Sequence, residues 1–373
     1  MKFDTLAVHA GAAIDAETGA VAPPLHLSTT FEHAPDGSAP HGFSYQRGDN
    51  PTQLRLEQAL TALDGGAAAL FCASGMAAGS TLLHAFPAGS HLLLQDDIYH
   101  GFRTLARDYF ERWNLGVSSV DMTDLDAVRA ALTPKTCLVW AESPSNPLLK
   151  VIDITALAEL THAHDAKLVI DNTFATPVLQ RPLMLGADIV LHSATKYMGG
   201  HSDVMGGALV FRQDSELVAT ARLVSSTIGF NASPFAAWLV LRGLRSLPVR
   251  IERHCANARA VAEFLERHAR IEAVHYPGLA SHPQHALAAR QMRDFGGMLS
   301  FRVNGGRDAA LDVASHLCLF VNATSLGGCE SLVEHRASVE GAHPVSPANL
   351  LRLSVGIEDK EDLIADLAGA LNR

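Results

Sequence analysis

Short apolar runs alternate with amphipathic stretches along the first two thirds of the chain. Leu56, Leu60 and Leu63 share one stripe of a helix expected over 53–63, and a second helix is expected over 153–164, capped by Asp153. The runs that read as buried strands are 67–72, 91–95, 137–140, 167–170, 189–191 and 208–211. Apolar strands separated by helices predict a mostly parallel α/β sheet covered on both faces.

The pattern changes at about residue 229. Helices are expected over 234–243, 248–268, 308–316 and 359–371, strands over 271–276, 298–303 and 350–355, and an exposed loop over 338–347. The Gly-, Pro-, His- and Ser-rich N-terminus reads as an arm packed on another subunit. We therefore expect an N-terminal arm, a large domain and a smaller C-terminal α+β domain, over 1–50, 51–230 and 231–373.

Composition excludes several classes of function. The 373 residues are 48% hydrophobic and 18% charged, which supports a sizeable core. A net charge of −10 without a block of basic residues argues against nucleic acid as a partner. The nineteen histidines form no His-Glu-x-x-His, so no metal site is predicted. The apolar runs fall short of the roughly 20 residues that span a bilayer, so no membrane segment is expected.

The five cysteines are scattered and form no Cys-x-x-Cys. Reduced thiols in a cytoplasmic protein are the expected state. The N-terminus also lacks the apolar core of a signal peptide.

The most informative stretch for chemistry is 187–207. The run 189–191 leads into Ser193-Ala-Thr195-Lys196 and then a glycine-rich loop. A lysine at the end of a buried strand is costly unless it is paired, neutral or covalently bound. Ser193 and Thr195 could hold a phosphate while the Lys196 amine forms an imine, as a pyridoxal phosphate (PLP) enzyme requires. A solvated lysine at an ordinary strand end is the alternative, and this stretch alone does not decide between them.

Other polar residues follow the carboxyl ends of predicted strands. Tyr99, Asn146 and Asp171 join Lys196 at this edge, where ligands of parallel α/β sheets bind. Asp171 could keep the cofactor ring nitrogen protonated, Tyr99 could stack on the ring, and Asn146 could hydrogen-bond its phenolic oxygen. The alternatives without a cofactor are that Asp171 caps a turn and that Tyr99 is an aromatic residue of the core.

A phosphate cup and a carboxylate receptor complete this set. Arg352 alternates out of an apolar strand and could grip a substrate carboxylate, or it could lie on a solvated strand face. Candidates for the cup are Tyr45, Arg47, Gly75, Met76, Ser193 and Thr195, of which Gly75 and Met76 would open a helix. If their segment is extended, Tyr45 and Arg47, which are two residues apart, point to the same side. The alternative is that both belong to a surface loop before a helix capped by Thr52.

Eight motifs in order carry a resemblance to a known family. They are Tyr45-x-Arg-x-x-Asn-Pro-Thr52, Ser74-Gly-Met-Ala77, Asp97-Ile-Tyr99, Glu142-Ser-Pro-Ser-Asn-Pro147, Asp171-Asn-Thr173, Ser193-Ala-Thr-Lys-Tyr-Met-Gly-Gly-His-Ser-Asp203, Ser325-Leu-Gly-Gly-Cys-Glu-Ser331 and Arg352-Leu-Ser-Val-Gly-Ile-Glu358. From about residue 5 to the C-terminus the chain resembles the Cys/Met-metabolism (transsulfuration) family of PLP-dependent enzymes, which includes cystathionine γ-synthase, cystathionine γ- and β-lyases and methionine γ-lyase.

The resemblance implies an aspartate-aminotransferase-like fold (fold type I). It also implies a homotetramer of tight dimers in which Tyr45 and Arg47 reach the phosphate of the neighbouring subunit. Lys196 would form the Schiff base and move protons at Cα and Cβ, and Tyr99 would assist proton transfer. Asn146, Ser325 and Arg352 would position the amino-acid substrate, and Thr173 would join the cofactor residues.

The chain departs from the family near the expected substrate. Thr324 stands where a glutamate commonly precedes Ser-Leu-Gly-Gly in members acting on cystathionine, which removes a carboxylate that could hold a distal ammonium. His100 follows Tyr99, and Gly101 replaces the cysteine typical of methionine γ-lyase. His100 could recognise substrate or shuttle protons, or it could point away into packing.

The resulting hypothesis is a PLP-dependent lyase. We expect β- or γ-elimination from a sulfur-containing or other γ-substituted L-amino acid. The alternatives are γ-replacement on an O-acylhomoserine, a canavanine-type γ-lyase, and a non-catalytic PLP-fold binding protein.

Overall fold

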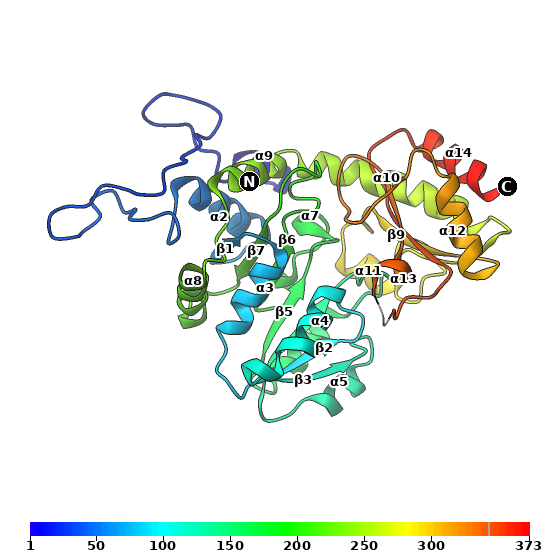
Figure 1. The fold of residues 1–373 in the computed structure, drawn as a ribbon, viewed down its shortest axis with the longest axis horizontal. Coiled ribbons are helices and arrows are strands. Elements are labelled where there is room, and N and C mark those ends of the chain that lie inside the picture. Colours follow the sequence, from blue (N-terminus) through cyan, green and yellow to red (C-terminus); the bar gives the residue numbers. More distant parts are fainter. Residues whose placement is uncertain (342–343) are drawn as a thin grey trace.

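The computed structural model describes residues 1–341 and 344–373, and its larger half is built on a seven-stranded sheet (Figure 1). The strands are β1 (Ala68–Cys72), β2 (His91–Gln95), β3 (Gly116–Val120), β4 (Thr136–Glu142), β5 (Lys167–Asp171), β6 (Ile189–Ser193) and β7 (Gly207–Phe211). Their order is β1-β7-β6-β5-β4-β2-β3, and only β7 runs antiparallel to its neighbours. The predicted mostly parallel sheet is confirmed.

Helices cover both faces of this sheet, which explains why its strands are continuously apolar. Leu92 and Leu94 pack in one buried cluster with α3, while Leu93 between them packs in another with α6. The helices of this half are α2 (Pro51–Asp64), α3 (Gly75–His84), α4 (His100–Tyr109), α5 (Leu125–Ala131), α6 (Ile154–His162), α7 (Thr176–Leu179), α8 (Glu216–Ile228) and α9 (Pro234–Leu244), with short 3-10 turns at Glu111–Trp113 and Pro182–Leu185.

The C-terminal half is a five-stranded sheet in the order β10-β11-β12-β9-β8. Its strands are β8 (Ile271–His275), β9 (Met298–Val303), β10 (Val321–Asn322), β11 (Leu332–His335) and β12 (Leu350–Ser354). Its helices are α10 (Leu247–Glu266), α11 (His285–Gln291), α12 (Gly306–His316), α13 (Arg336–Val339) and α14 (Lys360–Leu371). All pairings are antiparallel except β10 with β11.

Helix α10 joins the two halves (Figure 1). Ile251 belongs to the core of the large half, and Val261, further along the helix, belongs to the C-terminal core. Leu241 of α9 shares the first core with Leu56 of α2, so α9 packs with the large sheet. The division at residues 50 and 230 stays a prediction.

Sequence reasoning misplaced some local features. Helix α2 begins at Pro51, and its cap is Asn50, whose side chain accepts a hydrogen bond from the Thr52 N–H; the expected cap, Thr52, lies inside the helix. Helix α1 (Phe3–His9) is an addition to the expected arm. Strands β3, β10 and β11 and helix α8 were not expected. Of these, β3 is partly exposed and β10 has two residues, so both lack a strong apolar run.

Most described residues of the expected exposed loop over 338–347 are exposed, but its first two residues are helical. Residues 342–343 lie outside the described part. The Glu340 side chain is only 1% exposed.

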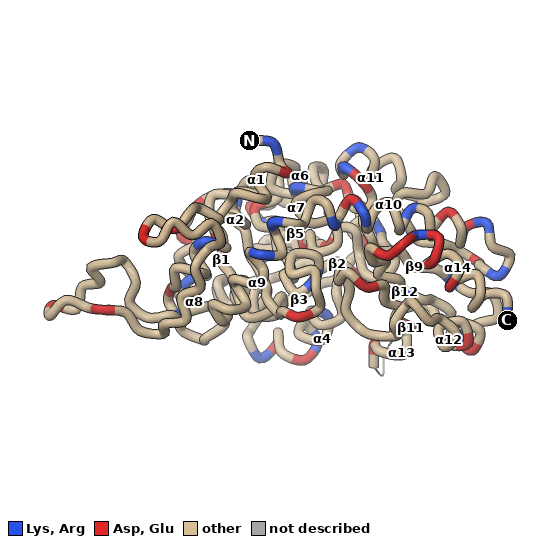
Figure 2. The backbone as a smooth tube through the Cα atoms, turned by 90° about the horizontal axis from the view of Figure 1, so that it is seen from above, with Lys and Arg blue, Asp and Glu red and all other residues tan. Residues whose placement is uncertain are grey.

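Charges are mixed over the whole molecule. Figure 2 shows Lys and Arg interspersed with Asp and Glu along both halves. Within the described residues, no helix combines the length and apolar character that crossing a bilayer demands.

Candidate active site

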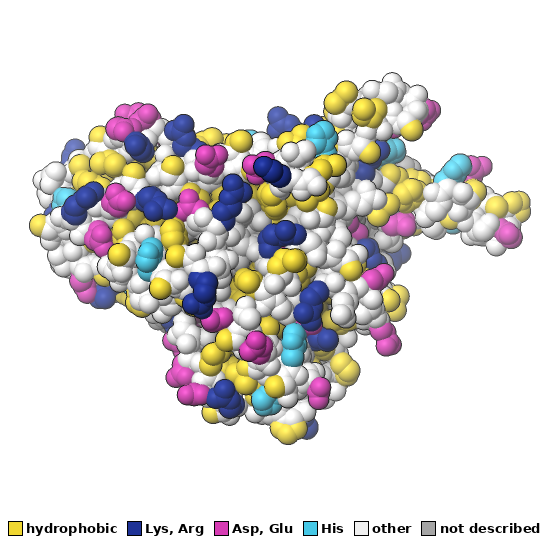
Figure 3. Space-filling model, turned by 180° about the vertical axis from the view of Figure 1, so that it is seen from behind, with side chains coloured by type: hydrophobic (Ala, Val, Ile, Leu, Met, Phe, Trp, Pro, Cys, Tyr) yellow, Lys and Arg dark blue, Asp and Glu magenta, His cyan; other side chains and the backbone are white. Residues whose placement is uncertain are grey.

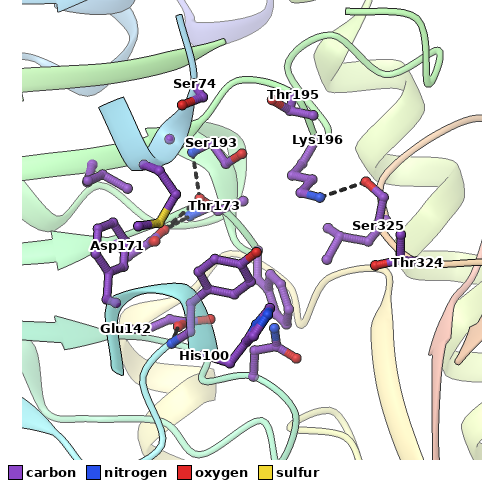
Figure 4. A pocket seen from close by; sticks show the side chains of 18 of the residues that line it. Ser74, His100, Glu142, Asp171, Thr173, Ser193, Thr195, Lys196, Thr324 and Ser325 are labelled. Carbon is purple, nitrogen blue, oxygen red and sulfur yellow. Dashed lines mark hydrogen bonds between the residues drawn. The ribbon is translucent and has the colours of Figure 1, made fainter. Parts of the chain in front are cut away.

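A cavity of about 230 Å³ lies where the carboxyl edge of the large sheet meets the C-terminal half (Figure 4). It is lined by most of the residues that the sequence analysis selected: Gly75, Met76, Tyr99, His100, Asn146, Asp171, Thr173, Ser193, Thr195, Lys196, Thr324, Ser325 and Arg352. Parallel strands β4, β5 and β6 end at this edge, so residues that follow them meet there.

Lys196 points across the cavity to the C-terminal half (Figure 4). Its Nζ lies 2.6 Å from the Ser325 Oγ, to which it donates a hydrogen bond. Burial, together with the nearby Arg352 guanidinium, lowers the pKa of Lys196 to about 8. Ser325 has a φ of 84°, a conformation that costs energy for a residue with a side chain and recurs at functional sites. The structure therefore holds a partly neutral amine against a strained hydroxyl.

Asp171 lies at the end of β5, across the cavity from Ser325. The Thr173 backbone N–H and hydroxyl both donate to its Oδ1, at 3.0 and 2.5 Å. Burial raises the pKa of this carboxyl, while the Thr173 hydrogen bonds oppose the shift. Because both bonds reach one oxygen, Oδ2 is available to a donor such as the protonated ring nitrogen of PLP.

The start of α3 forms the expected cup for a phosphate. Ser74 caps the helix by accepting from the Ala77 N–H, and first-turn N–H groups such as those of Gly75 and Met76 have no acceptor within a helix. A Cβ on Gly75 would lie 3.2 Å from the Cβ of Ser193, so glycine keeps this approach open. The Thr195 hydroxyl lines the cavity but already exchanges hydrogen bonds with the Gly206 backbone.

This donor set fits PLP. The cavity has a suitable size and is lined by the Lys196 amine, by the Asp171 carboxyl, which would face the ring nitrogen, and by the start of α3. Among the residues that the structure describes, no group of three or more His, Cys, Asp or Glu side chains could hold a metal ion.

Tyr45 and Arg47 are not brought to this cavity. Arg47 donates to the Ser226 carbonyl at 2.8 Å, and its guanidinium lies 5.7 Å from the centre of the Tyr45 ring. The two side chains thus share one side of the segment, but Tyr45 is 50% exposed. Their contact with the phosphate of a neighbouring subunit stays a prediction.

Tyr99 and His100 both line the cavity, where α4 begins. The Tyr99 N–H donates to the Glu142 Oε2 at 2.9 Å. The His100 ring contacts the Tyr99 ring edge-on, with centroids 4.6 Å apart. Burial and the nearby Arg336 and Arg103 lower the pKa of His100, which favours the neutral ring. His100 thus lines the cavity while its ring packs on Tyr99, and its role toward substrate or protons stays a prediction.

Arg352 is buried, not solvated, with 3% of its surface exposed. It donates from Nη1 to the Asn146 Oδ1 at 3.1 Å and from Nη2 to the Ser325 carbonyl at 3.0 Å. Its Nη2 also lies 2.9 Å from the Glu334 Oε2. Two residues far apart in sequence, Asn146 and Arg352, thus form one receptor suited to a carboxylate.

Sequence reasoning missed three charged residues of the site. Glu142 and Arg336 line the cavity, and Glu334 lies directly opposite Arg352 in the β11–β12 pairing. Burial, with Asp171 and Asp97 nearby, holds the pKa of Glu142 well above its usual range. Glu142 could have been found because it ends the strand that leads to Asn146. Glu334 and Arg336 had no such signal, since β11 itself was not expected.

Comparisons with known proteins agree with this geometry. The family model described as Cys/Met metabolism PLP-dependent enzyme matches residues 4–372. A cystathionine gamma-synthase of Mycobacterium tuberculosis is 50% identical, over 98% of this chain and 96% of the relative. A cystathionine gamma-lyase of Dictyostelium discoideum is 44% identical, over 100% and 98% of the two chains. The crystal structure of metB from Corynebacterium glutamicum superposes with a TM-score of 0.97 at 44% identity, covering 100% of this chain and 98% of the other.

These findings confirm the predicted family, the fold type I architecture and PLP as the cofactor. The match spans nearly the whole chain, so it covers the arm, the cavity and the C-terminal half alike. The chain belongs to the Cys/Met-metabolism family of PLP-dependent enzymes.

Proposed function

We propose that this enzyme eliminates the γ- or β-substituent of a sulfur-containing or homoserine-derived L-amino acid. The observation that carries the proposal is the Lys196 amine, 2.6 Å from Ser325 in the cavity that Arg352 also lines. It supports a mobile base beside a carboxylate receptor, which is what proton transfer at Cα and Cβ demands. The relatives named as cystathionine synthases and lyases support the same reaction class.

Each residue has a proposed part in this chemistry. PLP, when bound, supplies an electron sink for negative charge at the substrate's Cα. Lys196 binds its aldehyde and then moves protons, Asp171 holds its ring nitrogen, and Tyr99 stacks on the ring and assists proton transfer. Ser193 and Thr195, together with the Gly75 and Met76 backbone, hold the phosphate end, and Thr173 holds Asp171 in place through two hydrogen bonds. Arg352 and Asn146 bind the α-carboxylate and so orient the Cα–H bond.

The cavity has few charged carboxylates, and this favours substrates whose side chain carries no distal ammonium group. Among the described residues that line the cavity, the carboxylic acids are Glu142 and Asp171. Asp171 faces the cofactor, and burial together with the nearby Asp171 and Asp97 raises the pKa of Glu142, which disfavours its charged form. Thr324 supplies no charge where family members acting on cystathionine commonly carry a glutamate. A distal ammonium, as in cystathionine or an incoming cysteine, therefore has no evident anionic partner.

A second candidate is γ-replacement on an O-acylhomoserine. The 50% identity to a cystathionine gamma-synthase favours it. The comparisons favour neither a canavanine-type lyase nor a non-catalytic binding protein.

The two candidates differ in their need for a thiol. Holoenzyme incubated with methionine or O-succinylhomoserine is expected to release a 2-oxo acid without added cysteine, and cystathionine in the same panel is expected to react more slowly. Product formed only when cysteine is present would establish replacement and contradict elimination.

The site itself is tested by chemical trapping. Borohydride reduction followed by peptide mass spectrometry is expected to place a pyridoxyl group on Lys196. A pyridoxyl group on another lysine, or on none, would contradict the assigned site.

We further propose a homotetramer of dimers with shared active sites. The arm extends away from the rest of its chain (Figures 1 and 3) and exposes Val21 and Leu27 by 68% and 65%. Such an arm gains stability from a second copy. A cytoplasmic location stays a prediction from the scattered cysteines.

A further inference from the structure

A row of alternating charges crosses the substrate side of the cavity. Arg352 and Arg336 share the Glu334 Oε2, at 2.9 and 2.6 Å from Nη2 and Nη1 respectively. Arg336 Nη2 and Arg103 Nη2 each lie 3.6 Å from the Glu340 Oε1. Three guanidinium groups therefore face two carboxylates, which leaves an excess of positive charge at this end of the cavity.

Arg336 and Arg103 both have spare hydrogen-bonding capacity, and of the two it is Arg336 that lines the cavity. Arg336 is only 3% exposed. Within the described residues its guanidinium makes one hydrogen bond, to Glu334, and its Nε has no partner. Arg352, by contrast, also binds Asn146 and Ser325. A buried arginine with unused donors has room for an anionic ligand.

Arg336 shares both of its carboxylate partners, Glu334 with Arg352 and Glu340 with Arg103. Glu340 accepts hydrogen bonds from the Val345 and Ser346 N–H groups and from the Ser346 hydroxyl, so its carboxylate is already engaged. Besides burial, the charge of Arg336 helps to lower the pKa of His100, which lines the same cavity, although Glu340 and Glu334 oppose this effect.

We propose that Arg336 binds an anionic group at the far end of the substrate side chain. The enzyme then prefers a γ-substituted amino acid whose leaving group carries a carboxylate over one whose leaving group is neutral. Arg352 with Asn146 receives the α-carboxylate, and Arg336, on the same carboxylate of Glu334, receives the second anion. The preference for a leaving group rests on the proposed elimination; the contact itself does not.

The activity test compares two esters that differ by a carboxylate. For the wild-type holoenzyme, kcat/KM is expected to be higher for O-succinyl-L-homoserine than for O-acetyl-L-homoserine. Arg336→Gln is expected to lower the succinyl value by about 10- to 100-fold more than the acetyl value, since a hydrogen bond to a charged group is lost. Arg103→Gln is the matched control, because Arg103 also pairs with Glu340 but does not line the cavity.

Equal losses for both esters would overturn the proposal, because they are what a purely structural role in holding Glu334 and Arg352 would produce. An unchanged ester ratio in Arg336→Gln, or the same shift of that ratio in Arg103→Gln, would also overturn it. If Arg336→Gln does not fold, Arg336→Lys keeps the charge without the planar fork and is expected to retain part of the preference. A wild-type preference for the acetyl ester would refute the proposal without any variant.

A binding test separates this inference from the reaction class. L-2-Aminoadipate carries a distal carboxylate that L-norleucine lacks. Binding to the wild-type holoenzyme, followed by the cofactor absorbance, is expected to favour aminoadipate, and Arg336→Gln is expected to abolish the difference. If no ester is turned over but this difference is present and Arg336-dependent, elimination falls and the anion contact stands. If aminoadipate binds no better than norleucine, the anion contact falls.

Discussion

At the scale of single residues, the site depends on charges held where water is scarce. The Lys196 amine is the clearest case, because its charged form is penalised by burial and by the nearby arginines. A base whose pKa is brought towards neutrality can both give and accept protons near physiological pH. Lys196 is thus prepared for proton transfer by its surroundings.

The lowered pKa of Lys196 predicts a pH dependence of stability. In the cofactor-free protein the folded state loses this proton near pH 8, whereas the unfolded chain keeps it to about 10.5. Between these values the unfolded state binds more protons, so the contribution of Lys196 to the free energy of unfolding rises with pH. Urea unfolding at both ends of this window should show a larger rise for wild type than for Lys196→Met. Parallel pH profiles for the two proteins would contradict the assignment.

Thr324 is predicted to restrict the choice of substrate. Thr324→Glu places a carboxylate in the cavity wall, so it should raise kcat/KM for cystathionine by about tenfold, through pairing with the distal ammonium. Thr324→Gln is the uncharged control. If the glutamate variant gains nothing over the glutamine variant, position 324 does not decide against cystathionine.

At the scale of elements, the beginning of α4 determines where Tyr99 lies. Tyr99 is the residue before the helix, and its N–H is held by Glu142 at the end of β4. Gly101 lies beneath the ring, where a Cβ would approach Tyr99 Cε1 to 2.6 Å and Met76 Sδ to 2.9 Å. The absence of a side chain at 101 therefore allows the ring its place over the cavity.

Gly101→Ala is predicted to move Tyr99. Because the displaced ring stacks less well on the cofactor, kcat/KM should fall by roughly tenfold, with little change in Tm. Gly369→Ala, in α14, is the control, since its Cβ would meet nothing within 4 Å. Wild-type activity in Gly101→Ala would show that the ring has room to adjust.

At the scale of the whole molecule, the cavity needs both halves of the chain. Lys196 and Asp171 come from the large half, whereas Ser325 and Arg352 come from the C-terminal half. The proposed assembly adds a third source, since Tyr45 and Arg47 lie on an arm outside their own cavity. Each complete site would then combine two chains.

Shared sites predict complementation between inactive subunits. Lys196→Ala and Arg47→Ala should each have little activity alone. Refolding them together should restore roughly a quarter of the wild-type activity, because half of the dimers are mixed and each has one intact site. If the mixture is no more active than its components, Arg47 acts within its own chain or not at all.

The pattern of apolar runs, strand ends and local motifs was sufficient to predict the sheet, the cofactor and most of the cavity residues. Strand ends are informative because parallel strands bring their carboxyl ends to one edge whatever their order. The engagement of Asn146 by Arg352 follows from packing between halves and could not be read from either segment.

What the sequence determined by itself is local: which segments are buried strands, which polar residues follow them, and which motifs place the chain in its family. The tertiary structure alone decided the charge pattern around the substrate. Glu334 and Arg336 become part of the site only because β11 pairs with β12 and α13 follows it. Interactions between charges depend on distance and burial, and neither quantity is set until distant segments pack together.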